Sequence, residues 1–89
     1  MNIEELVAAI SEKKSACRQL DKLIINIETE KVVKIAGAGG YYSHSYHDDG
    51  MVDAQLQLLR LHRHELQRDL DSLLKKQETL NLLLSGEGL

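Results

Sequence analysis

Apolar residues in the first third of the chain recur with the seven-residue spacing that is typical of packed helices. Two series, offset from each other by three residues, form this stripe: Ile3, Leu6, Ile10, Cys17, Leu20, Ile24 and Ile27. Such spacing places the apolar side chains on one face of a helix. Asn2 followed by Glu5 is typical of a helix start, and Gly37 is a typical residue just beyond a helix end. The pattern therefore predicts a helix over residues 2–36.

The second half of the chain repeats this pattern over a similar length. Its apolar positions are Val52, Leu56, Leu59, Leu66, Leu70, Leu73, Leu80 and Leu84. Arg63 and Gln77 interrupt the series. The spacing predicts a second helix over residues 51–84, followed by a frayed tail at 85–89. The absence of proline from the whole sequence agrees with two long uninterrupted helices.

A polar, glycine-rich connector at residues 37–50 separates the two helices and forms the tip of a hairpin. An antiparallel pairing brings Leu20 near Leu66, and it brings Arg63 close to Glu28. The expected fold is all-α, a single domain over residues 1–89 built as a long, coiled-coil-like helical hairpin. Its apolar seam is predicted to contain Ile10, Cys17, Leu20, Ile24, Ile27, Leu59, Leu66, Leu70 and Leu73.

Further apolar residues lie outside this seam, and a two-helix hairpin leaves them in contact with water. They are Ile25, Val32, Leu58, Leu61 and Leu82. A chain of 89 residues is also short for a stable core. Stacking two hairpins about a twofold axis into a four-helix bundle covers such residues, so we expect a homodimer. A different protein covering the same surface is the main alternative.

Composition excludes several classes of function. The net charge is −3, with both signs mixed along both helices, which argues against nucleic-acid binding. Apolar runs such as residues 6–10 and 82–84 are far too short for a membrane span. Cys17 is the only cysteine and the start of the chain is acidic, so we expect a cytoplasmic protein.

The connector holds all three tyrosines of the protein, and the sequence contains no Phe or Trp. Tyrosine is enriched where proteins bind one another, because it combines apolar area with a hydroxyl group. We therefore regard Tyr41, Tyr42, His44 and Tyr46 as candidate partner-binding residues. The alternative is that these rings only pack against the end of the bundle.

The connector also contains the best candidate metal ligands in the sequence. These are His44, His47, Asp48 and Asp49. Imidazole and carboxylate groups suit zinc or another divalent metal, although structural zinc sites usually include cysteines. The alternative is a solvated turn in which Asp48 or Asp49 caps the second helix. We expect no cofactor, with a divalent metal as the alternative.

No combination of residues in the sequence points to catalysis, and a thin helical hairpin has little room for a cleft. We therefore expect a non-enzymatic protein–protein interaction module, an adaptor or a small inhibitor such as phages encode, which binds a larger protein through the tip or a bundle face. A small metal- or ligand-binding module is one alternative. A structural coiled-coil spacer with an inert tip is another.

Overall fold

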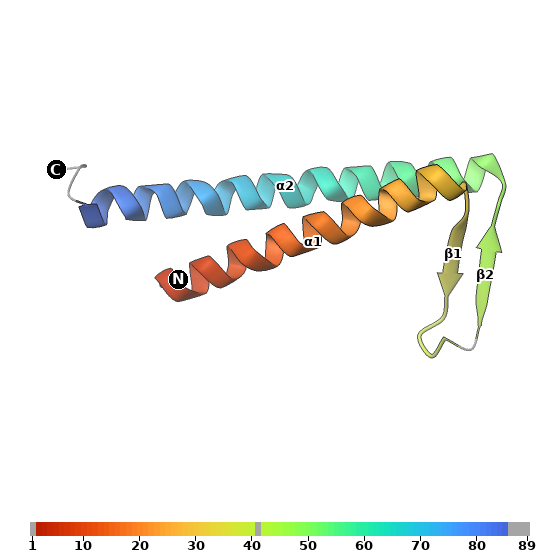
Figure 1. The fold of residues 1–89 in the computed structure, drawn as a ribbon, viewed down its shortest axis with the longest axis horizontal. Coiled ribbons are helices and arrows are strands. Elements are labelled where there is room, and N and C mark those ends of the chain that lie inside the picture. Colours follow the sequence, from red (N-terminus) through yellow and green to blue (C-terminus); the bar gives the residue numbers. More distant parts are fainter. Residues whose placement is uncertain (1, 41, 86–89) are drawn as a thin grey trace.

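The computed structural model describes residues 2–40 and 42–85, and it consists of two long helices joined by a short strand pair. The helices are α1 (Ile3–Glu30) and α2 (Asp49–Ser85), and the strands are β1 (Val33–Ala36) and β2 (Ser43–Tyr46). Figure 1 shows α1 running back along α2, with the two helices closest near the strands and farther apart toward the chain termini. The predicted helical hairpin is confirmed.

Helix α1 begins as the sequence predicts. The Asn2 side chain accepts a hydrogen bond from the Glu5 backbone N–H at 2.7 Å and donates one to the Glu5 carboxylate at 3.2 Å. Glu4 and Glu5 also place negative charge at the positive end of the helix dipole. The first bond satisfies the Glu5 backbone N–H, which a helix start otherwise leaves unpaired, and the second joins the two side chains.

The predicted end of the first helix at residue 36 is wrong, because α1 ends at Glu30. Lys31 takes the left-handed conformation, with φ of 57°, and its N–H donates to the Ile27 carbonyl at 2.8 Å. Three of the next four residues are the β-branched Val32, Val33 and Ile35. Residues of this type lose side-chain freedom in a helix and suit a strand, so the chain leaves the helix before Gly37.

The segment after α1 forms an arm that extends to one side of the helices (Figure 1). Strand β1 pairs antiparallel with β2, so that Val33 lies opposite Tyr46 and Ile35 opposite His44. At the turn, Gly37 N–H donates to the Tyr42 carbonyl at 2.7 Å. We call β1, β2 and their turn the β arm, and the paired helices the stem. The arm is an addition to the expected all-α fold.

The core lies along the contact between α1 and α2, with one contribution from the arm. Its buried apolar side chains are Leu6, Ile10, Cys17, Leu20, Ile24, Ile27, Val33, Val52, Leu56, Leu66 and Leu70. Leu59 and Leu73 of the expected seam are partly buried and pack against this cluster. Val33 is 6% exposed, so it fixes the base of the arm to the stem.

Helix α2 begins two residues earlier than predicted. The Asp48 carboxylate accepts a hydrogen bond from the Met51 backbone N–H at 2.9 Å, which caps the helix. At the other end, Ser85 is still helical. The rest of the predicted tail, residues 86–89, lies outside the described residues.

Candidate protein-binding surfaces

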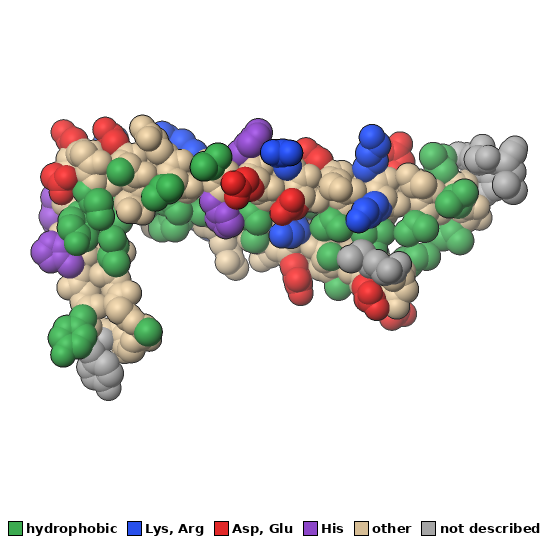
Figure 2. All heavy atoms as spheres, turned by 180° about the vertical axis from the view of Figure 1, so that it is seen from behind, with side chains coloured by type: hydrophobic (Ala, Val, Ile, Leu, Met, Phe, Trp, Pro, Cys, Tyr) green, Lys and Arg blue, Asp and Glu red, His purple; other side chains and the backbone are tan. Residues whose placement is uncertain are grey.

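The aromatic residues of the β arm are arranged by the two-residue alternation of its strands. His44 and Tyr46 lie on the same strand face, with ring centroids 4.6 Å apart and ring planes at 64°. Tyr42 lies at the turn and is 85% exposed. Tyr41, the fourth candidate, lies outside the described residues. Figure 2 shows apolar side chains at the far end of the arm and where the arm meets the stem.

The four candidate metal ligands are not brought together. His44 stacks edge-on against Tyr46, and the Asp48 carboxylate caps α2. Over residues 2–40 and 42–85, no group of three or more His, Cys, Asp or Glu side chains is placed to hold a metal ion. The arrangement of His44, His47, Asp48 and Asp49 therefore provides a helix cap and exposed polar groups.

One side of the stem is closed by charged and amide side chains. Arg63 donates to both carboxylate oxygens of Asp21, at 2.8 and 3.3 Å, and to the Gln67 side chain at 3.0 Å. Gln67 donates in turn to Asp71 at 2.9 Å. Arg60 lies 3.6 Å from Glu28 along the same side. We call this set of six residues the charged flank.

Arg63 is the centre of the charged flank. Its side chain is 26% exposed, and the hydrogen bond to Asp21 raises the pKa of its guanidinium above the ordinary value. The predicted contact between Arg63 and Glu28 is wrong, because Arg60 lies beside Glu28 instead. A forked guanidinium held by one carboxylate also fixes how the two helices align on this side.

The opposite side of the stem carries a shallow groove with very different chemistry. Leu23 and Asp21 flank the buried stripe of α1 on opposite sides, since successive helical residues are 100° apart. Two adjoining hollows of about 260 and 520 Å³ share Leu23, which is 46% exposed. We call them together the neutral groove. Glu30 lines its arm end, and its other stem residues are Ala16, Gln19, Leu20, Leu23, Asn26, Ile27, Gln55, Leu59, His62 and Leu66.

Among the described stem residues that line the two hollows, Glu30 at the end of α1 is the only Lys, Arg, Asp or Glu. Glu30 and Lys34 line the end of the groove toward the arm, the Lys13–Asp69 ion pair at 3.5 Å lies toward the chain termini, and Glu65 lies 4.0 Å from His62. Sequence reasoning missed this surface. The signal was present in Ala16 and Leu23, which widen the apolar stripe on the side where α2 offers Gln55 and His62.

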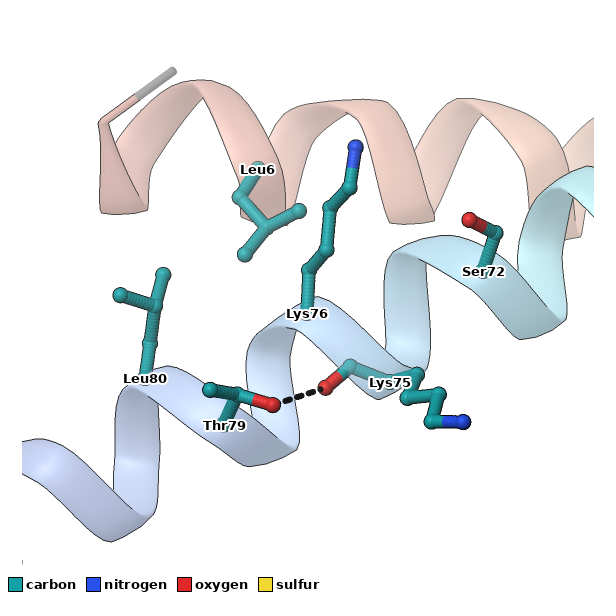
Figure 3. A pocket seen from close by; sticks show the side chains of 6 residues that line it. All are labelled: Leu6, Ser72, Lys75, Lys76, Thr79 and Leu80. Atoms are coloured by element: carbon teal, nitrogen blue, oxygen red, sulfur yellow. Dashed lines mark hydrogen bonds between the residues drawn. The ribbon is translucent and has the colours of Figure 1, made fainter.

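A further hollow of about 600 Å³ lies where the helices diverge toward the chain termini. Figure 3 shows Leu6 and Leu80 pointing toward one another from the two helices, while Lys76 extends toward α1 and Lys75 points away. Thr79 donates to the Lys75 carbonyl at 3.0 Å. No carboxylate or imidazole belongs to this lining, so the described side chains supply no acid–base pair there.

Comparison with family models, with curated proteins and with solved structures finds no match to this chain. Within residues 2–40 and 42–85, neither helix has an apolar stretch long enough to cross a membrane.

Proposed function

We propose that this chain is a non-enzymatic protein-binding module, an adaptor or small inhibitor, that presents its β arm to a larger protein. The observation that carries the proposal is the exposure of Tyr42, 85% accessible at the end of an arm that extends away from the stem. An isolated tyrosine in this position contributes little to folding. It supplies the large, rigid contact area that is typical of binding hot spots.

The construction of the arm supports this proposal. Its base is anchored by Val33, which is buried against the stem, and the half-buried Tyr46 lies opposite Val33. Its outer part exposes Ile35, which is 45% accessible and lies opposite His44. An arm that is held in one orientation before binding loses less conformational entropy when a partner engages it. A cytoplasmic location, favoured by the single cysteine, belongs to this proposal.

The test is an affinity pull-down from lysate of the source cell or its host, comparing wild type with Tyr42→Ala. We expect wild type to retain one partner in near-stoichiometric amount, and Tyr42→Ala to lose at least about tenfold in affinity. Ser45→Ala is the matched control, because Ser45 is also exposed on the arm but lies on the other strand face. Circular dichroism checks that helicity is equal in all three proteins.

Equal retention of the partner by wild type and Tyr42→Ala contradicts the role of the arm. A spacer with an inert tip gives that result, and it also keeps its activity when residues 38–42 are replaced by a short Gly/Ser turn.

A further inference from the structure

We propose that the neutral groove is the interface of a homodimer, in which a second copy of the chain packs its own neutral groove against it about a twofold axis. This surface lies mainly on the stem, and the proposal does not rest on the partner-binding role of the arm. Three properties of the groove point to a second copy as its occupant: exposed area, scarcity of charge, and self-complementary polar groups.

The exposed area of the monomer is large for its mass. The chain exposes 6864 Å² at 10.0 kDa, whereas a compact monomer of this mass exposes about 5,200 Å². The excess is about 1,600 Å², and a standard stable interface removes about 800 Å² from each partner. A twofold contact along the groove therefore fits within the excess and brings the exposed area toward that of a compact protein.

The scarcity of charge favours a second copy over an unrelated partner. In a twofold interface, residues near the axis face their own copies, so a charged side chain there meets a like charge. The chain carries a net charge of −3, yet ten of the eleven stem residues that line the groove are not Lys, Arg, Asp or Glu, and the exception, Glu30, lies at its arm end. A groove that selects a different protein commonly does so through complementary charge, and these ten residues offer none.

The polar groups of the groove are suited to pairing with themselves. Gln19, Asn26 and Gln55 have amide side chains, each with both donor and acceptor atoms. Any of these groups can bond to its own copy across a twofold axis. The charged flank lacks this property, because Arg63 donates only and Asp21 accepts only.

Leu23 is the central apolar contact of this interface. It is 46% exposed, and it belongs to both hollows of the groove. Ile25 lies two residues away on the same helix and is 61% exposed, but it belongs to neither hollow. The two positions therefore form a matched pair, alike in size and exposure and different only in their relation to the groove.

The test is sedimentation equilibrium of the full chain over a wide concentration range. We expect wild type to have twice the monomer mass of 10.0 kDa. Leu23→Lys should raise the dimer dissociation constant by about a hundredfold or more, because it places two like charges in a desolvated contact. Ile25→Lys and Tyr42→Ala should remain dimeric. A loss of the dimer in Tyr42→Ala would overturn the assignment of the interface to the groove.

Gln19→Glu is a second variant with almost no change of shape, for use if Leu23→Lys fails to fold. It should weaken the dimer by about tenfold at neutral pH, since it adds a charge to the same neutral contact. A wild-type protein that is monomeric at millimolar concentration overturns the proposal. A dimer that is indifferent to both groove variants, or that Ile25→Lys disrupts equally, also overturns it.

Discussion

The two sides of the stem border the same apolar core, but they differ in their charged residues and in the hydrogen bonds that their side chains form. On the charged flank, Arg63 joins Asp21 and Gln67 in a chain of hydrogen bonds that satisfies these groups within one molecule. In the neutral groove, Leu23 is half-exposed, and among the described residues its neighbours form no such chain across the helices. The comparison shows that one side of a helical hairpin can be completed internally while the other keeps a half-exposed apolar side chain, which the proposed dimer would cover.

The difference arises from positions on either side of the same stripe. On the side toward Asp21, the acidic Asp21 and Glu28 of α1 meet the basic Arg63 and Arg60 of α2, so the pairing of the helices also pairs these charges. The side toward Leu23 carries Ala16, whose small side chain leaves the flank of the stripe open. Side-chain size and charge at these few positions therefore decide which flank is filled within the monomer.

The largest expected effect comes from the core that both flanks share. Ile24 is 8% exposed, and Ile24→Ala should lower the free energy of unfolding by about 2–4 kcal/mol through lost burial and a cavity. The measurement is urea denaturation at one fixed protein concentration, since the stability of a dimer depends on concentration.

The neighbouring Ile25 provides the control for this substitution. It is 61% exposed, so Ile25→Ala should change stability by less than about 0.5 kcal/mol. Equal losses at the two positions would show that both side chains are buried to the same degree in solution.

A smaller effect is expected from breaking the charged flank alone. Arg63→Met keeps the apolar stem of the side chain but removes the bonds to Asp21 and Gln67. Because both charged groups are partly solvated, the loss should be about 1 kcal/mol, and sedimentation should show an unchanged dimer.

Arg68→Met is the control for Arg63→Met. Arg68 is exposed on the same helix and has no hydrogen bond or ion pair within the described part of the chain, so its replacement should leave stability unchanged. A loss of the dimer in Arg63→Met would remove the distinction between the two flanks.

The smallest expected effect is the response to salt, which separates the flanks without any substitution. Raising ionic strength from about 0.1 M to about 1 M screens exposed pairs such as Arg60–Glu28 and should cost no more than about 0.5 kcal/mol of stability. The neutral groove has charges only at its arm end, at Glu30 and Lys34, so the dimer dissociation constant should change by less than about threefold. A strong weakening of the dimer by salt would place charged residues in the interface.

The helical hairpin could be predicted because its signals repeat along the chain. The seven-residue spacing of Ile10, Cys17 and Ile24 specifies a buried face over three turns or more, and Asn2 with Glu5 specifies a start through local hydrogen bonds. The partners of individual charges could not be predicted in the same way. Arg63 bonds to Asp21 rather than Glu28 because a shift of two helical turns is set by packing, which spacing does not fix.

The β arm was missed because its strands depend on contacts outside the local sequence. Val32, Val33 and Ile35 gave a local signal against a helix, but their pairing with residues 43–46 requires the chain to reverse first. The left-handed conformation of Lys31 carries no sequence signal, since glycine or asparagine is usual there. One of the candidate metal ligands has a local role instead, because the Asp48 carboxylate caps α2.

The pairing register of β1 and β2 restricts which insertions can lengthen the arm during evolution. Val33 must face the stem for the arm to be anchored, and Ile35 shares that strand face. Adding one residue to each strand would turn the outer half of the arm over, whereas adding two to each would restore the original faces. Insertions that preserve the surface of the arm therefore come in fixed increments of four residues, each extending its reach by about 7 Å.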